Sequence, residues 1–499
     1  MLAQVKFHSL EEEVIFLRAE NAELKERIVQ LEALVEKLTK MVFGKRSEKL
    51  PRPFKEIEKQ DTVKANKEKI KKRRNRRKNL RLQKLREVKI VHLVPEEQRQ
   101  CPECHNSDLK PVGTGKESIL YEFVPAHFEK QIHIQETLSC PCGDYIVTAP
   151  GAERPVEGGH YGTRFIAHVI VSKCVDSIPL YRMEKMFERL GIGMARSTMC
   201  NLFHQAAHLL EPICKQMQML VLTSLIVLAD ETPIPVLDEK LTKTRRGYIW
   251  AFLSDDVAYY RFSATRSGET PTDVLGNSQG TLLVDGYTGY NAVTTPDGRD
   301  RAGCWAHVRR EFFDSLKTAP IEAQHMLDEI LELYRVEYEA IKRNLIGKSA
   351  HTQLRQEKSS PILTRIKKWL EQQQPHHLPK SPMGQAISYT LNQWTALNHY
   401  LTDGQIPIDN NASERKMRII ALGRKNYLFA GHDDAAQNLA IHQSIVATCE
   451  MHGVNPEVYI ADILIRIQHH KNKNILDLLP HRWKELFAPG IPNSLIDTG

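Results

Sequence analysis

The sequence predicts a multidomain protein with a coiled coil, a small β domain, a helical region and an α/β domain. Three observations lead to this prediction. The chain has 499 residues, more than one hydrophobic core usually accommodates. Leucines recur every seven residues near the N-terminus. After Leu225 the apolar pattern changes from a helical period to short strands that alternate with helices.

The composition argues against a membrane protein. No stretch approaches the roughly 18 consecutive apolar residues of a membrane-spanning helix. The first residues, "MLAQVKFHSLEEEV", contain no apolar signal-peptide core. We therefore expect a cytoplasmic protein without membrane contact. Its nine cysteines are then expected to be thiols or metal ligands rather than disulfides.

Residues 1–50 are predicted to form a leucine-zipper coiled coil. One heptad position carries leucine and the other carries mostly β-branched residues, a combination that favours two parallel strands. Asn21 at the second position would fix the register and the number of strands. A long amphipathic helix packed on its own chain is the alternative. The leucines of the repeat are Leu10, Leu17, Leu24, Leu31 and Leu38.

Residues 51–94 are predicted to be a basic linker that also contacts the DNA backbone. Pro51 and Pro53 end the preceding helix. Between Thr62 and Ile90 the net charge is +12, so the rest of the chain carries −4 of the total of +8. Such a block favours a polyanionic partner, nucleic acid first, with a solvated linker as the alternative. The arginines at its centre are Arg73, Arg74, Arg76 and Arg77.

Residues 95–150 are predicted to be a small zinc-binding β domain. Two close pairs of cysteines supply four thiolates, a set that suits a tetrahedral zinc ion. The second pair has one residue between its cysteines instead of two, and His105 could replace one cysteine. Unligated cysteines are the alternative. The segment "YEFVPAHFEKQIHIQETLSC" alternates like paired strands. The predicted ligands are Cys101, Cys104, Cys140 and Cys142.

Residues 158–220 are predicted to be helical and to resemble a helix-turn-helix. In "IPLYRMEKMFERLGIGMARSTMCNLFHQAAHLL", Gly191 and Gly193 mark a tight turn between two helices. A helix-turn-helix presents the start of its second helix to a DNA groove. Ordinary packing of a helical hairpin is the alternative. The residues at the start of this helix are Arg196, Ser197 and Thr198.

The region after Leu225 reads as strand, strand, strand, helix, strand, strand, helix. This is the order of a ribonuclease-H-like sheet, which we predict for residues 221–430. A long helical stretch at about 321–401 would be an insertion into that domain, and residues 431–499 would form a C-terminal helical region. The strand-forming runs are "LIVLADETPIPV", "GYIWAFLS", "VAYYRFSA", "GTLLVDGYTGY" and the start of "RAGCWAHVRREFFDSL".

Three carboxylates stand at the ends of the expected elements. In a ribonuclease-H-like fold the first strand, the fourth strand and a late helix each bring one carboxylate to a single point. Here these would be Asp230, Asp285 and Glu414. They would be oxygen ligands of two Mg²⁺ (or Mn²⁺) ions, one activating the attacking hydroxyl and the other stabilising the leaving oxygen. Ordinary surface acids are the alternative.

Two further acids compete with these assignments. Glu231 follows Asp230, but the alternation of a strand points neighbouring side chains to opposite sides. Asp409 could be a ligand, although it or Asn410 more simply caps the helix that carries Glu414. The bases after Glu414 are predicted to hold DNA phosphates. These bases are Arg418, Arg424 and Lys425.

At this point the chain resembles the main transposase of insertion sequence 66 type elements, which are bacterial mobile DNA. The resemblance rests on "ADETPIPVL", "LLVDGYTGYNAV", "CWAHVRREFFD" and "DNNASERKMRIIALGRKNYLFAG". The last is the most specific. The N-terminal heptads, the "CPEC" and "CPC" pairs and the "PLYRMEKMFERLG" helices also match in order. The resemblance covers nearly the whole chain.

The resemblance implies a DDE transposase with Asp230, Asp285 and Glu414 in the catalytic positions. It implies cleavage and strand transfer of double-stranded DNA at terminal inverted repeats, near the bacterial nucleoid. It also implies a homodimer or higher oligomer and element-encoded accessory proteins. Cys304 and His307 match the family's Cys-x-x-His element, for which we favour local packing over metal binding. The compressed second cysteine pair and the long basic block depart from the family pattern.

Two other functions compete with transposition. A zinc-containing DNA-binding regulator with an inactive ribonuclease-H-like domain would also bind DNA but would not need all three carboxylates. A ribonuclease-H-like nuclease would hydrolyse DNA without strand transfer. The predicted zipper, zinc domain and helix-turn-helix favour the pairing of two DNA ends, which a plain nuclease does not need.

Overall fold

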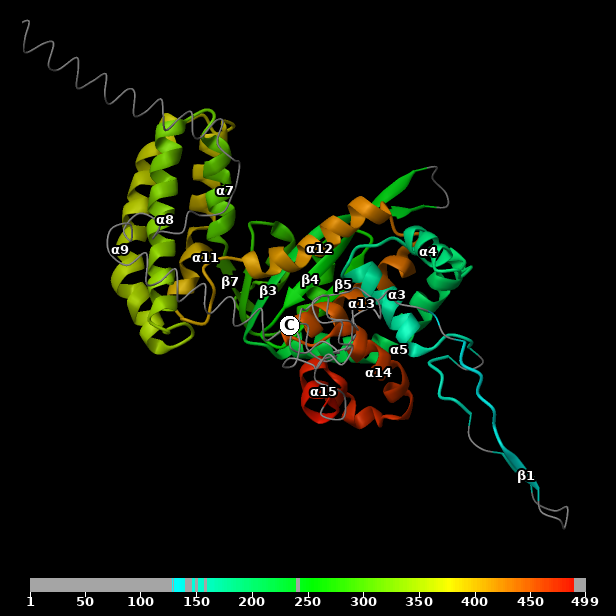
Figure 1. Ribbon diagram of the computed structural model, residues 1–499. Coiled ribbons are helices and arrows are strands. Elements are labelled where there is room, and N and C mark those ends of the chain that lie inside the picture. The colour runs from blue at the N-terminus through cyan, green and yellow to red at the C-terminus, as the bar shows by residue number, and fades with distance from the viewer. Residues whose placement is uncertain are drawn as a thin grey trace, which may run out of the picture. The chain divides into compact units, whose positions relative to one another are not determined.

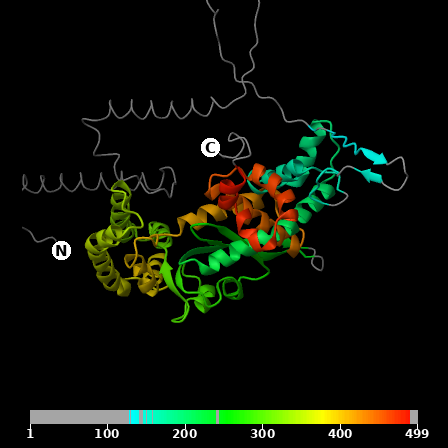
Figure 2. The same ribbon diagram turned by 90° about the horizontal axis from the view of Figure 1, so that it is seen from below.

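The structure is a computed structural model, shown in Figure 1 and, turned by 90°, in Figure 2. It describes residue 128 and residues 130–139, 146–148, 151–156, 159–238 and 243–488. The predicted coiled coil, the basic linker and the four predicted zinc ligands lie outside these residues and stay predictions. No helix in the described ranges is both long and apolar enough to cross a membrane.

The strands expected between the two cysteine pairs are shorter than predicted. Among the described residues of this segment, strand structure is confined to β1 (Thr137–Ser139), which pairs antiparallel with β2 (Ile146–Thr148). Residues 130–136 have no strand structure and are exposed. Alternation predicts a strand only where a partner covers one face, and these residues have no such cover in the described part of the chain.

Three helices build the region predicted to be helical. α3 (Thr163–Cys174), α4 (Leu180–Arg189) and α5 (Arg196–Thr223) follow one another. In the turn between α4 and α5, Gly191 has a φ of +80°, a conformation that favours glycine. The helix, turn and helix therefore lie where predicted, while DNA recognition by them stays a prediction. Their small shared core contains Val169, Met183, Phe187, Met194 and Met199.

A five-stranded mixed sheet lies at the centre, with the strand order β5-β4-β3-β6-β7. Within this sheet β4 pairs antiparallel with both β3 and β5, and β6 and β7 run parallel to β3. This sheet is compatible with the predicted ribonuclease-H-like domain, and its strands lie where the apolar runs predicted them. The strands are β3 (Ile226–Leu237), β4 (Thr244–Leu253), β5 (Ala258–Ser263), β6 (Gly280–Val284) and β7 (Arg299–Gly303).

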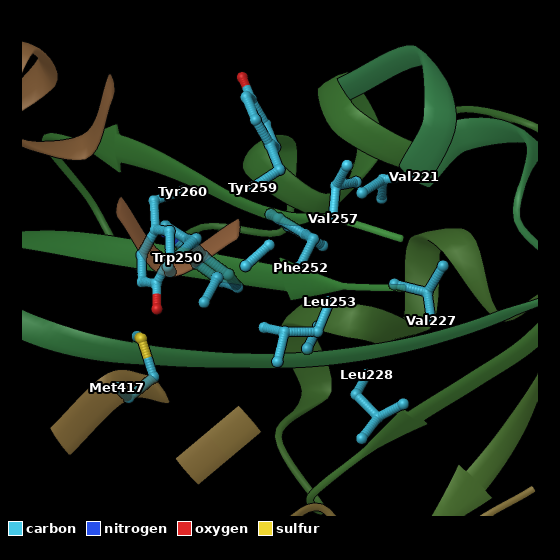
Figure 3. Packing of buried hydrophobic residues seen from close by; sticks show 14 of the residues in the cluster. Val221, Val227, Leu228, Trp250, Phe252, Leu253, Val257, Tyr259, Tyr260 and Met417 are labelled. Carbon is cyan, nitrogen blue, oxygen red and sulfur yellow. The ribbon is translucent and has the colours of Figure 1, made fainter. Parts of the chain in front are cut away.

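The sheet is covered on both faces. Residues 249–253 of β4 are buried without interruption, as expected for a strand with packing on each side. Figure 3 shows Trp250 and Phe252 of this strand in one apolar cluster with Tyr260 of β5 and Met417. The helices connected to the strands are α6 (Glu269–Leu275), α7 (Trp305–Ser315) and α12 (Asn411–Tyr427).

β5 is an edge strand of the sheet, and its outer edge is covered by a helix from the C-terminal region, α13 (Asp433–Met451). Polar side chains of this helix accept hydrogen bonds from alternate backbone N–H groups of the strand. Thr448 Oγ1 accepts from Ala258 at 3.1 Å, and Ser444 Oγ accepts from Tyr260 at 2.8 Å. Gln437 Oε1 accepts from the next alternate residue, Phe262, at 3.1 Å. The helix thus satisfies an edge that would otherwise be open to another strand.

The predicted insertion is helical, and Figure 1 shows it beside β7. Its buried Arg355 forms a bidentate pair with Glu337, at 2.8 and 2.7 Å. The same guanidinium donates to the carbonyls of Tyr400, Asp403 and Ile406. The insertion therefore fixes the segment that leads into α12. Its helices are α8 (Pro320–Lys342), α9 (Ser349–Gln373), α10 (Pro382–Asn392) and α11 (Trp394–Asn398).

The remaining elements complete the C-terminal region and the connections. Trp483 is fully buried there, and its indole N–H donates to Asp462 Oδ2 at 2.7 Å. The helices are α14 (Pro456–His469) and α15 (Pro480–Leu486). The 3₁₀ segments are η2 (Thr288–Val293), η3 (Gln374–His376), η4 (His399–Leu401) and η5 (Asn472–Leu478).

Candidate active site

The register of two parallel strands brings the first two predicted carboxylates to the same level. Leu228 of β3 pairs with Leu283 of β6. Asp230 lies two residues further along β3, and Asp285 lies two residues beyond Leu283, directly after the end of β6, so the two acids stand at corresponding positions. This follows from the parallel pairing, because both strands carry their side chains in the same alternation.

The turn that carries Asp285 is held from three directions. Arg301 donates to the carbonyls of Asp285 and Tyr287, at 2.6 and 2.8 Å. The Asp285 Oδ1 atom accepts the N–H of Tyr287 at 3.0 Å. The Gly286 N–H donates to the hydroxyl of Tyr389 from the insertion at 3.1 Å. A Cβ atom at Gly286 would lie 2.6 Å from the Tyr389 ring, so this position needs glycine.

The helix that carries Glu414 is attached directly to the strand that carries Asp230. The Asn410 side chain donates through Nδ2 to the carbonyl of Ala229 at 2.7 Å. The backbone N–H of Asn410 donates to Cys304 Sγ at 3.2 Å. Asn410 is 1% exposed, so these contacts are shielded from water. They place the first turn of α12, with Glu414, beside Ala229 and Asp230 in the first half of β3, a strand that continues to Leu237 rather than ending at its acids as predicted.

The three carboxylates act on one another electrostatically. Burial, followed by the charges of Glu231, Asp285 and Glu414, raises the pKa of Asp230 to about 8. Within the described residues, the carboxylate of Asp230 accepts one hydrogen bond, from the N–H of Glu231 at 2.9 Å. Acids thus gather around Asp230, whose own carboxyl has no cationic hydrogen-bond partner among the described residues. Such oxygen-rich, electronegative sites suit divalent cations.

The two competing acids have other partners. Glu231 accepts from Arg266 and, at 2.6 Å, from the hydroxyl of Tyr290. Asp409 accepts from the hydroxyl of Tyr334 at 2.8 Å and from the backbone N–H of Asn411 at 3.0 Å. The latter contact is a cap of α12, supplied by Asp409 rather than by the Asn410 side chain. These contacts leave both acids with structural roles.

Glu414 has basic neighbours that sequence reasoning did not anticipate. Arg310 of α7 donates to Glu414 Oε2 at 3.1 Å. His307 Nδ1 lies 3.6 Å from Glu414 Oε1. The described part of the chain contains one group of three His, Cys, Asp or Glu residues whose potential metal-ligand atoms all lie within 4.8 Å of one another. It consists of Cys304, His307 and Glu414. The only sequence signal was the Cys-x-x-His spacing together with the arginines that follow it.

The bases predicted to hold phosphates differ in their surroundings. Arg418 and Lys425 are exposed on α12, and Arg415 is exposed beside them. Arg424 instead points to β3, where it donates to Thr232 Oγ1 at 3.0 Å and to the carbonyl of Pro233. The exposed residues can therefore reach a ligand in solvent, whereas the Arg424 guanidinium ties α12 to the sheet.

The predicted groove-facing residues open α5. Arg196 and Ser197 are exposed, and Thr198 is half-buried. The backbone N–H of Arg196 donates to Glu184 of α4 at 3.1 Å, which caps the start of α5 with a carboxylate. Within the described residues, no hydrogen bond or ion pair joins these three residues to the three carboxylates.

Comparisons with known proteins identify three matching regions. A family described as "Transposase IS66 family" matches residues 158–438. The family's "IS66 C-terminal element" matches residues 444–481, and the "zinc-finger binding domain of transposase IS66" matches residues 98–143. The last match supports a zinc ion in the region of the two cysteine pairs.

Full-length relatives are also similar. An uncharacterized protein of Sinorhizobium fredii, y4jD, is 31% identical over 413 residues, which cover 79% of this chain and 80% of the relative. A second uncharacterized protein of that organism, y4qI, is 30% identical over 95% of this chain and 92% of its own length. The similarity therefore extends over nearly all of the chain, including the segments before residue 128.

Proposed function

Since this chain belongs to the IS66 transposase family, we propose that it is a DDE transposase. It binds the terminal inverted repeats of a bacterial insertion sequence and catalyses metal-dependent DNA strand cleavage and strand transfer. The observation that supports this most strongly is the convergence of Asp230, Asp285 and Glu414, carried by β3, the end of β6 and α12. The reaction would take place on double-stranded DNA in the bacterial cytoplasm, at the nucleoid.

The three carboxylates would hold the catalytic ions, two Mg²⁺ or Mn²⁺. The donor set fits hard cations, because it consists of carboxylate oxygens gathered around the buried Asp230, whose carboxyl would release its proton when an ion binds. Bound there, the ions would supply charge neutralisation and an activated hydroxyl for in-line attack at phosphorus. Two ions roughly 3.5–4 Å apart share only some of their ligands, so the three carboxylates need not all touch one point.

The chain's own residues position these groups and the DNA. Asn410 holds the Glu414 helix against β3, and Arg301 holds the turn of Asp285. Exposed Arg418 and Lys425 would bind phosphates of the DNA that enters the site. Such contacts are favourable because they release the counterions that are condensed on DNA. Arg196, Ser197 and Thr198 would read the inverted repeat in a groove.

The domain boundaries are part of this proposal. Residues 1–50 would pair two subunits, residues 51–94 would bind the DNA backbone, and residues 95–150 would hold zinc through the two cysteine pairs. Residues 158–220 would recognise the element end. Residues 221–430 would be the ribonuclease-H-like catalytic domain with its insertion at about 321–401. Residues 431–499 would support it, as α13 does at the edge of β5.

A DNA-binding regulator with an inactive ribonuclease-H-like domain is the second candidate. It predicts the same DNA affinity but no requirement for the three carboxylates. Accessory proteins of the element remain expected partners under both functions. The cleavage assay separates the two functions.

The test is cleavage and joining of a labelled inverted-repeat end by Asp230→Asn, Asp285→Asn and Glu414→Gln. These changes keep shape but remove ligand charge. Metal ions contribute several kcal/mol to such transition states, so each variant is expected to lose about 1,000-fold in cleavage rate. DNA binding, measured in parallel, should stay near wild type. Mg²⁺ or Mn²⁺ should be required, and Ca²⁺ should support binding with little turnover.

Asp409→Asn and Glu231→Gln are the controls. Both acids have structural partners, so their loss should lower stability more than the cleavage rate of the folded protein. If Asp409→Asn abolishes cleavage while Glu414→Gln retains it, the third carboxylate has been assigned to the wrong residue. If all three primary variants remain active, the DDE mechanism does not apply to this protein.

A further inference from the structure

The Cys-x-x-His element at the start of α7 has no role in the proposed reaction, yet the fold brings it to Glu414. Cys304 is the residue before α7, and His307 lies on its first turn. Glu414 comes from α12, more than 100 positions later in the chain. One potential ligand atom from each of the three lies within 4.8 Å of the other two.

We propose that Cys304, His307 and Glu414 form a binding site for a thiophilic divalent ion, zinc above all. The site itself rests on the geometry of the described residues. Its consequence, competition with the catalytic ions for Glu414, rests on the proposed function.

The separations of the donor atoms suit zinc. Zinc–ligand distances of about 2.0–2.3 Å in a tetrahedron place neighbouring donors roughly 3.3–3.8 Å apart. His307 Nδ1 and Glu414 Oε1 are 3.6 Å apart, which falls within that range and is too long for a hydrogen bond. The widest separation, 4.8 Å at most, needs an adjustment of about 1 Å to close on a metal.

The chemistry of the donors selects the class of ion. A thiolate sulfur and an imidazole nitrogen prefer zinc and similar transition metals, whereas Mg²⁺ takes oxygen ligands. His307 Nδ1 is buried and has no hydrogen-bond partner among the described residues, so its lone pair is free for a metal. With three protein ligands, a fourth position would remain for water or a phosphate oxygen.

The surroundings already orient two of the ligands. The backbone N–H of Asn410 donates to Cys304 Sγ at 3.2 Å and orients the sulfur. Burial raises the pKa of this thiol to about 12, so its proton would leave when the metal binds. Arg310 donates to both carboxylate oxygens of Glu414, at 3.1 Å to Oε2 and 3.4 Å to Oε1, and Oε1 also faces His307. Cys304 and Glu414 are therefore held in place by neighbouring donors, and His307 Nδ1 faces the same point.

Sharing Glu414 has a functional consequence. The Asn410 side chain ties the start of α12 to Ala229, the neighbour of Asp230, so Glu414 also lies beside the proposed catalytic ions. A zinc ion bound to Cys304 and His307 would draw Glu414 toward them and away from that site. Zinc would therefore inhibit the Mg²⁺-dependent reaction through this set of ligands.

The test uses the full chain, with the zinc-finger domain loaded with zinc, and Co²⁺ as the probe. Wild-type protein should bind one additional Co²⁺ per chain and show a thiolate-to-cobalt charge-transfer band. Cys304→Ser and His307→Gln should each weaken this binding at least about tenfold, the lower range for perturbed metal sites. Cys200→Ser, which changes a free cysteine outside the cluster, is the matched control and should bind like wild type.

Binding that is lost in Cys304→Ser and retained in Cys200→Ser supports the site. Equal cobalt binding by wild type and Cys304→Ser overturns it. The two ligand variants guard against a folding defect in either one, and thermal melting checks both. None of these readouts requires a cleaving enzyme, so failure of the proposed function would not imitate failure of the site.

A second measurement tests the sharing of Glu414. For each protein, the ratio of cleavage with and without added zinc is determined at saturating Mg²⁺. Wild type and Cys200→Ser should be inhibited, and Cys304→Ser should be inhibited at least about tenfold less sensitively. Equal zinc sensitivity in wild type and Cys304→Ser overturns the competition for Glu414.

Discussion

Asp230 is the single residue whose ionisation the fold changes most clearly at the candidate site. The carboxyl is removed from water and surrounded by other acids, which raises its pKa to about 8. The ordinary value for aspartate is about 3.9. The folded protein therefore retains a proton that the unfolded chain would release, over the range from about pH 4 to about pH 8.

This difference predicts a pH dependence of stability in Mg²⁺-free buffer. The folded state binds more protons in this range, so the contribution of Asp230 is greatest below about pH 4 and is lost as the pH rises through about 8. Asp230→Asn removes the free-energy cost of ionising this buried carboxyl as the pH rises. It should raise the melting temperature at pH 8 and flatten its decline between pH 4 and pH 8, as measured by thermal melts across this range.

Asp255→Asn is the control, because Asp255 is an exposed acid in the turn after β4. Its melting temperatures should follow wild type across the range. A wild-type pH profile in Asp230→Asn would show that the carboxyl is not buried among like charges in the folded protein.

At the scale of elements, α13 explains an unusual set of buried polar residues. Ser444, Thr448 and Gln443 are almost completely buried in this helix. Two of them accept hydrogen bonds from the backbone of β5: Ser444 Oγ from the N–H of Tyr260, and Thr448 Oγ1 from the N–H of Ala258. A buried polar group without a partner costs free energy, so these hydroxyls are tied to the register of the strand.

Removing these hydroxyls should destabilise the protein. Ser444→Ala and Thr448→Val would each leave a buried N–H of β5 unpaired, at a cost of about 1–3 kcal/mol in the free energy of unfolding. Thr364→Val in α9 is the control. Its hydroxyl is exposed and bonds only within its own helix, so we expect a change within about 0.5 kcal/mol. Urea denaturation measures all three, and similar losses would contradict the edge-covering role of α13.

The exposed face of α12 forms a second feature at this scale. At about 100° per residue, Glu414, Arg418 and Lys425 lie within about 40° of one another around the helix. The two bases are exposed, so a DNA strand bound along this face would lead to the candidate site.

Neutralising this face should weaken DNA binding without sequence preference. Arg418→Ala and Lys425→Ala should each reduce the salt dependence of DNA affinity by about one unit in the slope of log affinity against log salt. Lys416→Ala is the matched control, because Lys416 pairs with Glu450 at 3.0 Å instead of facing solvent. Equal slopes for all variants and wild type would place the DNA on another surface.

At the scale of the whole molecule, assembly depends on a segment outside the described residues. The leucine heptad over residues 7–42 predicts a parallel pair of chains. Replacing Leu24 and Leu31 by proline breaks both helices of such a pair and should give a monomer by light scattering. Leu24→Ile with Leu31→Ile, which keeps apolar side chains at these positions, is the control. A dimeric mass in the proline variant would show that another interface dominates.

Much of the sheet could be predicted, because β3, β4, β5 and β6 contain apolar runs that the sequence itself shows. The polar strand β7 was placed only by its position before α7. The change of period after Leu225 and the acids at Asp230 and Asp285 were visible without a structure. The parallel register that sets these acids side by side was an inference from the strand order, and the register of Leu228 with Leu283 supports it. The strand expected before Ser139 was too long, because alternation alone does not supply a partner.

The sequence by itself determined the kinds of element, their order and the family, since periodicity, glycine turns and short motifs are local properties of the chain. Only the tertiary structure decided which distant groups meet. Arg310 on Glu414, Asn410 on the strand of Asp230 and the hydroxyls of α13 on β5 join residues more than 100 positions apart. The physical reason is that such contacts depend on how layers pack and on where buried polar groups find partners, and neither is encoded in local spacing.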